Sequence, residues 1–317
     1  GIDILTGIEN LRGSSYNDTL TGNTGANTLW GLGGKDRIAG GLGNDAIDGG
    51  SGMDWAIYAT APAAVVVNLA TGTATGGHGS DTLTGIENAK GSGHNDTLTG
   101  NTGANRLAGG NGNDQINGGA GRDIMSGRSG NDVIDGGGGR DWAIYQGAPS
   151  GVTVNLGTGT ATGGHGSDTL TGIENAKGSG QNDTLIGSAG ANRLAGGNGN
   201  DNITGAAGND IINGGPGTDW VLYDTAPSAV IVNLANRTAT GGHGTDTLTG
   251  IENVKGSPYA DTITGSNAPN ILLGRPGDDT LYGAGGDDVL NGGLGNDTGN
   301  GGLGTDTCLT ESKTLCE

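Results

Sequence analysis

Apolar residues recur singly along this chain, every nine residues, in the middle of short polar–apolar–polar triplets. Alternation with a period of two predicts short, half-buried β-strands. Residues 46–48 and 115–117 are two such triplets, and each is followed directly by a pair of glycines. We expect the central residues to form one thin aliphatic core; among them are Leu98, Leu107, Ile116, Ile134, Leu185, Leu194, Ile203, Ile212, Leu272, Leu281 and Leu290.

A glycine-rich loop ending in aspartate precedes each expected strand. The aligned unit of nine residues reads G-G-x-G-x-D-x-U-x, with U apolar, as in 40–48 (GGLGNDAID) and 109–117 (GGNGNDQIN). Glycine allows positive φ and close approach of neighbouring backbones, and it disfavours helix by about 1 kcal/mol per position relative to alanine. A loop of six residues and a strand of three make half a coil. Two units would then form an 18-residue coil with two facing parallel sheets.

A longer repeat lies over the short one. Copies of D-x-L-T-G-I-E-N begin at Asp3, Asp81, Asp168 and Asp246, and the second interval exceeds the other two by one nonapeptide. The connecting stretch 58–75 has the length of two nonapeptides, so we expect it to form a regular coil. We therefore predict one continuous roll over 1–317, in four long repeats (1–80, 81–167, 168–245 and 246–307) with a C-terminal cap (308–317).

The charge of the chain indicates a bound cation. The 317 residues include 73 Gly, 14 Lys+Arg and 33 Asp+Glu, for a net charge of −19, and only 32% are hydrophobic. Low hydrophobicity with high net charge normally predicts disorder, and stacked coils would bring loop carboxylates to about 5 Å from one another. We expect no nucleic-acid partner, because the chain is acidic, and no membrane span, because no apolar run is long enough.

A divalent ion between neighbouring loops would turn this repulsion into attraction. Ca²⁺ accepts six to eight oxygen ligands, including main-chain carbonyls, whereas Mg²⁺ requires tighter octahedral geometry and Zn²⁺ prefers His and Cys. The alternative is that the aspartates only hydrogen-bond their own turns. We predict several Ca²⁺ ions as cofactors, with candidate ligands Asp36, Asp45, Asp54, Asp81, Asp96, Asp114, Asp123, Asp132, Asp141, Asp168, Asp183, Asp201, Asp210, Asp219, Asp246, Asp261, Asp279, Asp288, Asp297 and Asp306.

The nonapeptide resembles the calcium-binding repeat of the RTX (hemolysin-type) family, and residues 152–187 resemble a spacer common in its bacterial members. The resemblance covers nearly the whole chain. It implies an all-β fold, a right-handed parallel β-roll (β-solenoid) with two nonapeptides per coil, in which Asp and glycine carbonyls hold Ca²⁺ between turns. It also implies a secreted protein, extracellular or on the bacterial cell surface.

The same resemblance pairs aspartates of successive coils. These pairs are Asp36 with Asp54, Asp114 with Asp132, Asp123 with Asp141, Asp201 with Asp219, Asp279 with Asp297 and Asp288 with Asp306. Across the short links it pairs Asp81 with Asp96, Asp168 with Asp183, and Asp246 with Asp261. Loops 13–18 and 256–261 lack the inner glycines, and Asn replaces Asp at Asn27, Asn105, Asn192 and Asn270. We expect weaker sites or none at those positions.

Other recurring residues allow two interpretations each. We expect the imidazoles of the GGHG loops to be exposed, although metal ligation is an alternative (His78, His165 and His243). We expect the glutamates of the I-E-N links to brace loops with Lys90, Lys177 and Lys255, although they could be second calcium ligands (Glu9, Glu87, Glu174 and Glu252). Three tryptophans should cover the strands at 65–69, 152–156 and 230–234, although a sugar-stacking surface is possible (Trp55, Trp142 and Trp220). Counting half-coils places Trp220 on the sheet opposite the other two.

The sequence favours a structural or cell-surface role in which Ca²⁺ binding drives folding. Gly1-Ile2-Asp3 begins inside a motif, so we expect a processed chain or a fragment, whose open strand edge could assemble end to end into filaments. An even cysteine count in an exported protein suggests a disulfide between Cys308 and Cys316. We expect no enzyme, since no H-E-x-x-H motif or Ser or Cys nucleophile with a matching base is evident. The alternatives are the calcium-binding part of a secreted enzyme whose catalytic domain lies elsewhere, or an adhesin that binds surface glycans.

Overall fold

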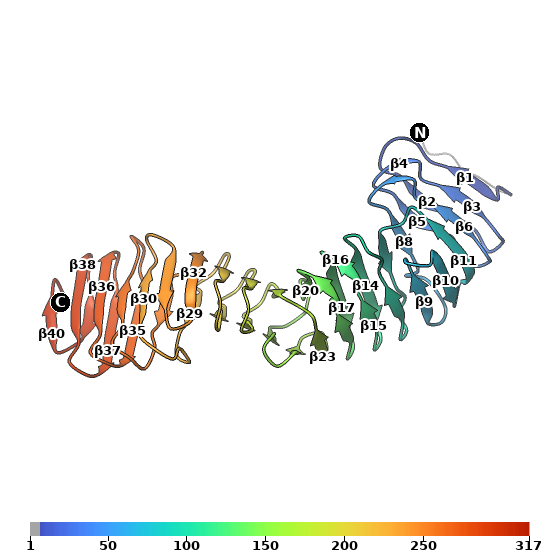
Figure 1. Ribbon diagram of the computed structural model, residues 1–317. Coiled ribbons are helices and arrows are strands. Elements are labelled where there is room, and N and C mark those ends of the chain that lie inside the picture. Colours follow the sequence, from blue (N-terminus) through green and yellow to red (C-terminus); the bar gives the residue numbers. More distant parts are fainter. Residues whose placement is uncertain (1–6, 317) are drawn as a thin grey trace. The chain divides into compact units, whose positions relative to one another are not determined.

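A computed structural model describes residues 7–316, which fold into short β-strands joined by tight loops (Figure 1). Parallel pairing fixes the length of a coil, because Thr19 of β2 (Thr19–Thr21) pairs with Arg37 of β5 (Arg37–Ala39), two nonapeptides later. This confirms the expected parallel β-roll. Residues 7–316 contain no helix, and therefore none that could cross a membrane. Asp3, which begins the first long repeat, lies outside the described residues.

The chain divides into two compact units, and unit 1 comprises 1–143 and 165–173. Sheet 1A of this unit contains β1 (Asn10–Arg12), β3 (Thr28–Trp30), β6 (Ala46–Asp48), β9 (Val65–Asn68), β10 (Thr73–Gly76), β11 (Gly79–Thr84), β13 (Thr97–Thr99), β15 (Gln115–Asn117), β18 (Val133–Asp135) and β23 (Gly166–Thr171). Sheet 1B contains β2, β5, β8 (Trp55–Ile57), β12 (Asn88–Lys90), β14 (Arg106–Asn111), β17 (Ile124–Ser129) and β20 (Trp142–Ile144). Two further parallel pairs of two-residue strands lie in the loops: β4 (Gly33–Gly34) with β7 (Ser51–Gly52), and β16 (Ala120–Gly121) with β19 (Gly138–Gly139).

Unit 2 comprises 144–164 and 174–317. Its sheet 2A contains β21 (Val152–Asn155), β22 (Thr160–Gly163), β25 (Thr184–Ile186), β27 (Asn202–Thr204), β29 (Trp220–Leu222), β33 (Asn253–Lys255), β35 (Ile271–Pro276), β37 (Val289–Leu294) and β39 (Thr307–Leu309). Its sheet 2B contains β24 (Asn175–Lys177), β26 (Arg193–Ala195), β28 (Ile211–Asn213), β30 (Val230–Asn233), β31 (Thr238–Gly241), β32 (Gly244–Thr249), β34 (Thr262–Thr264), β36 (Thr280–Gly285), β38 (Thr298–Leu303) and β40 (Ser312–Thr314). The single continuous roll over 1–317 stays a prediction, as do its repeat boundaries.

The core is a single seam of aliphatic side chains between the two sheets of each unit. All eleven apolar residues chosen from the nine-residue period are buried, none more than 2% exposed. In β38 the seam position is Gly299, and the side chain of Thr310 lies against it. Most polar residues that flank a central residue are exposed or partly exposed, with Asn88, Asn175 and Asn253 among the buried exceptions, so the period-two pattern correctly predicted the strands.

The stretches between the long repeats do not form regular coils. β9, β10 and β11 are antiparallel neighbours within sheet 1A, where Ala74 pairs with both Val67 and Asp81. Sheet 1B gains no strand at this level, because β8 pairs directly with β12. The regular coil predicted for 58–75 is therefore wrong. That stretch has the length of two nonapeptides but lacks their glycine loops, and a tight reversal at Gly72 (φ 67°) turns the chain back. β30, β31 and β32 form the same three-strand meander in sheet 2B.

The predicted sheet of two tryptophans can be checked within unit 1. Trp55 and Trp142 both lie in sheet 1B, as the half-coil counting predicts. Trp220 belongs to unit 2, in β29, so the opposite placement expected for it stays a prediction.

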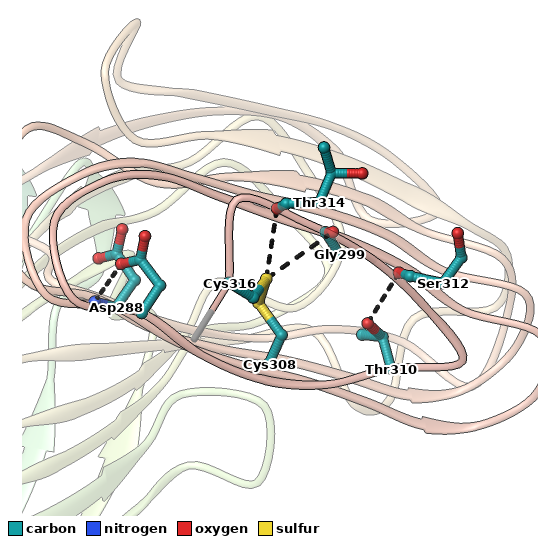
Figure 2. The surroundings of a disulfide bond; sticks show 8 residues. Asp288, Gly299, Cys308, Thr310, Ser312, Thr314 and Cys316 are labelled. Carbon is teal, nitrogen blue, oxygen red and sulfur yellow. Dashed lines mark hydrogen bonds between the residues drawn. A yellow bond between two sulfur atoms is a disulfide. The ribbon is translucent and has the colours of Figure 1, made fainter.

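The C-terminal residues close the last coil. Cys308 and Cys316 form a disulfide with Cα atoms 5.8 Å apart, as the even cysteine count suggested (Figure 2). β39 pairs with β37 and β40 pairs with β38, so the shortened final coil still continues both sheets. Cys316 Sγ lies 4.0 Å from the carbonyl oxygen of Gly299, which places the disulfide against the end of the core seam.

Candidate calcium-binding loops

A ladder of carboxylates connects successive loops. In each step, the backbone N–H of one loop aspartate donates to Oδ1 of the aspartate one coil later. The distance is 2.7 Å from Asp36 N to Asp54 and 2.8 Å from Asp114 N to Asp132. The other four predicted pairs of this spacing show the same contact: Asp123 with Asp141, Asp201 with Asp219, Asp279 with Asp297 and Asp288 with Asp306. The structure thus places all six pairs on neighbouring coils.

The three pairs predicted across the short links are wrong. Asp81 accepts the N–H of Asp45, and Asp96 accepts the N–H of Val65. The meander strands insert between the loops expected to be neighbours, so each aspartate meets a different partner. The same change replaces the pair Asp168 with Asp183 and the pair Asp246 with Asp261; Asp132 and Asp210 donate to the first member of each, and Val152 and Val230 to the second.

Glutamates fill the ladder position where a loop is shortened. Oε2 of Glu87 accepts the N–H of Asp54 at 2.9 Å, and Oε2 of Glu252 accepts the N–H of Asp219 at 2.8 Å. Glu311 does the same for Asp297 at the C-terminal cap. Glu252 therefore does not brace the loop with Lys255. Lys255 instead forms a salt bridge with Asp224, in which Nζ lies 2.9 Å from Oδ2. The sequence feature that could have predicted this role is the recurrence of Glu before Asn in every I-E-N link.

The second carboxylate oxygen separates two kinds of loop. We call a loop open where it has the pattern G-x-x-G-x-D without His at the third position, and where the aspartate Oδ2 is buried and receives no hydrogen bond from the described residues. Buried polar atoms normally have a partner, and an isolated one calls for an explanation such as an ion. The open loops end in Asp36, Asp45, Asp54, Asp114, Asp123, Asp132, Asp201, Asp210, Asp219, Asp279, Asp288, Asp297 and Asp306.

In closed loops, with the pattern G-S-x-x-x-D, a serine satisfies the carboxylate. The backbone N–H of Ser92 donates to Asp96 Oδ2, and its hydroxyl donates to Oδ1 at 2.8 Å. Ser179 and Ser257 bind Asp183 and Asp261 in the same way. A different donor closes the GGHG loops: the hydroxyl of Tyr58 donates to Asp81 Oδ2 and that of Tyr223 donates to Asp246 Oδ2, each at 2.9 Å.

The first glycine of an open loop leaves room for oxygen atoms. A Cβ built on Gly109 would collide with Asp114 Oδ2 and would lie 2.9 Å from the carbonyl oxygen of Gly127 in the next coil. A carboxylate oxygen and a main-chain carbonyl therefore face the same α-carbon. Gly112, the fourth residue of the loop, has φ of 116°, a conformation that favours glycine. The ligands gathered at an open loop are therefore oxygens from both side chain and main chain.

The open-loop carboxyls are strongly desolvated. Burial raises the pKa of four of them to about 7 (Asp114, Asp201, Asp210 and Asp279) and of four others to about 6 (Asp123, Asp132, Asp219 and Asp288). Neighbouring carboxylates raise the pKa further, and the ladder hydrogen bond lowers it. A nearby cation would reverse this balance by favouring the ionised form.

The donor set fits calcium. Across residues 7–316, no three His, Cys, Asp or Glu side chains converge on one point, so a cation would need main-chain carbonyls as further ligands. Ca²⁺ accepts that mixture of carboxylate and carbonyl oxygens, whereas a structural zinc site would require more nitrogen or sulfur ligands.

The imidazoles of the GGHG loops are not generally exposed. His78 is 4% exposed and lies beside Tyr58, with ring centroids 5.8 Å apart, and His243 is 7% exposed beside Tyr223. The expected exposure is therefore wrong for these two, while His165 is partly exposed. The reason is that the turn following each preceding strand folds over the loop, which Thr60 shows by lying 3.5 Å from His78 Nε2.

Comparison with known families agrees with this geometry. The repeat described as the RTX calcium-binding nonapeptide repeat matches more than half of the chain, at residues 3–38, 12–47, 21–55, 90–125, 109–143, 171–203, 186–221, 255–290 and 273–308. The chain belongs to this family and is a calcium-binding β-roll module, an architecture that is not a known catalytic fold. The unmatched stretches contain the meanders. No curated protein matches the chain.

Proposed function

We propose that the chain is a secreted, structural or cell-surface β-roll whose open loops bind Ca²⁺ and whose folding depends on that binding. The observation that carries the proposal is the set of buried aspartate Oδ2 atoms without hydrogen bonds, one in each open loop. Proteins of the RTX family are typically secreted by bacteria, which supports the extracellular placement. Calcium sites in extracellular modules bind at about 10⁻⁴–10⁻³ M, so the roll would load only outside the cell.

The closed loops have a different role in this proposal. Their carboxylates already accept serine or tyrosine hydrogen bonds, so we assign them to structural turns rather than to calcium. The assignment removes Asp81, Asp96, Asp183, Asp246 and Asp261 from the expected ligand set. Calcium then occupies successive open loops, and each block of them is bordered by coils that need no ion.

A matched pair of substitutions tests the assignment. Asp288→Ala should lower the number of Ca²⁺ ions bound at saturation, because it removes an open-loop Oδ2. Asp261→Ala should leave that number unchanged and reduce the free energy of unfolding by about 1–3 kcal/mol for each donor left unpaired, since Ser257 and Val230 both donate to Asp261. Equilibrium dialysis with calcium analysis and urea unfolding at fixed Ca²⁺ measure the two effects. Loss of calcium in the Asp261 variant, or none in the Asp288 variant, would refute the assignment.

End-to-end assembly is part of the same proposal. β1 pairs with β3 on one side, and among the described residues it has no strand on the other. An open edge of this kind can pair with another chain. Electron microscopy in Ca²⁺ should show filaments at high protein concentration, and uniformly short particles at every concentration would argue against assembly.

A further inference from the structure

A groove in unit 1 lies on the outer face of sheet 1B around Trp55. It has a volume of about 380 Å³, and its wall includes Lys35, Arg37, Asn88 and Arg106. Parallel pairing sets three of these residues in one row, since Arg37 pairs with Trp55 and Trp55 with Asn88, which in turn pairs with Arg106. Neighbouring strands are about 4.8 Å apart, so the row places one aromatic ring between two guanidinium groups.

The tryptophan does not cover the meander strand. Trp55 lies in sheet 1B and its neighbour Ala56 fills the core, whereas the expected partner strand β9 lies in sheet 1A. The indole is instead partly exposed at the groove, and the Arg37 guanidinium carbon lies 5.5 Å from its ring centroid. The predicted covering role is therefore wrong for Trp55.

The positive charge of the groove is not neutralised by the protein. Within the described residues, none of Lys35, Arg37 and Arg106 is in a salt bridge, although the chain has 33 acidic residues. The wall contains one carboxylate, Asp18, and both the N–H and the hydroxyl of Ser14 donate to its Oδ2. The groove wall therefore carries three positive charges and one negative charge, a net charge of +2 on a strongly acidic molecule. Such a local field attracts an anion.

The floor of the groove is fixed. Asn88 is 1% exposed, its Oδ1 accepts the N–H of Arg106 at 2.9 Å, and its Nδ2 donates to the carbonyl of Asp54 at 3.1 Å. Both of its polar groups are therefore occupied, which leaves recognition to the arginines, the lysine and the indole. A guanidinium binds a carboxylate through two parallel hydrogen bonds, and an indole offers a rigid apolar face with a polar N–H edge.

We propose that this groove binds a saccharide with carboxylates on successive rings, with Arg37 and Arg106 each binding one carboxylate and Trp55 lying against the sugar ring between them. The groove borders two open loops, 31–36 and 49–54, which contribute Lys35 and Met53 to its wall.

Isothermal titration of the calcium-saturated full chain tests this proposal, with trigalacturonic acid as the probe. Trp55→Ala and Arg106→Gln should each weaken binding at least tenfold. Equivalent residues elsewhere are matched controls: Trp220 stands between Asn202 and Asn253, and Arg193 beside Ile211. Trp220→Ala and Arg193→Gln should change the affinity less than twofold. Dilution of the probe into calcium buffer corrects for calcium bound by the sugar itself.

Two further probes define the chemistry. The methyl ester of trigalacturonic acid should bind at least tenfold more weakly than the acid, because it lacks the charges. Inorganic phosphate at the same concentration should not compete. Equal binding of acid and ester, full competition by phosphate, or unchanged affinity in the Arg106 variant would overturn the proposal. Circular dichroism in Ca²⁺ confirms that each variant is folded, so failure of this site is distinguishable from failure of calcium loading.

Discussion

Removal of calcium at pH 7.5 is expected to abolish the β-strand signal of the chain in circular dichroism and leave a coil spectrum. Each open loop buries a carboxylate oxygen that receives no hydrogen bond from residues 7–316, and burying unpaired charge is strongly unfavourable. At 10 mM Ca²⁺, a site of 10⁻⁴–10⁻³ M affinity stabilises the folded state by about 1.4–2.7 kcal/mol. A few such sites together equal the roughly 5–15 kcal/mol by which folded domains are typically stable.

The measurement is a spectrum in EDTA followed by titration with Ca²⁺. Mg²⁺ at equal ionic strength is the control, and it should restore little signal because it requires a tighter octahedral site. A spectrum that is the same in EDTA and in Ca²⁺ would contradict the coupling between binding and folding.

Acidification should favour the folded state when calcium is absent and oppose it when calcium is present. Without an ion, burial raises the folded-state pKa of eight open-loop carboxyls to about 6 or 7, from about 3.9 in the unfolded chain. A raised folded pKa contributes stability that is present at low pH and lost as the pH rises through the folded value. Each such group changes stability by up to about 1.4 kcal/mol per pH unit within that window.

Calcium reverses the sign because its ligands must be ionised. We expect the β-strand signal in EDTA to be larger at pH 5.0 than at pH 7.5, and the urea midpoint in Ca²⁺ to be lower at pH 5.0 than at pH 7.5. Both pH values lie above the isoelectric point of about 4.2, which limits aggregation. The same direction of change in EDTA and in Ca²⁺ would show that the open-loop carboxyls do not control stability.

The short-range structure was predictable because the nonapeptide carries it. Leu281 and Ile116 could be assigned to the core from their period alone, and the resemblance to the RTX family supplied the six aspartate pairs on successive coils. The turn, the strand and the register each depend on residues within two adjacent units. Local spacing was therefore sufficient.

The meanders and the links were not predictable in the same way. Residues 58–75 match two nonapeptides in length, and only pairing with sheet partners decides whether a strand runs parallel or antiparallel. Because of that choice, Asp81 accepts a hydrogen bond from Asp45 and is not the neighbour of Asp96 that was predicted. The closed loops needed one further step, since Ser92 donates to Asp96 through both its backbone and its side chain. The sequence shows the serine, but only the folded loop shows that the carboxylate is satisfied.

The placement of the meanders depends on a simple parity. Within unit 2, β21 pairs with β25 in sheet 2A, whereas β30, the equivalent strand of the next long repeat, pairs with β34 in sheet 2B. Because consecutive nonapeptides alternate between the sheets, gaining or losing one unit would transfer the next meander to the other side of the roll, whereas gaining or losing two would return it. Insertion or deletion of a single nonapeptide can thus redirect whatever a meander displays, without any change in the sequence of the meander itself.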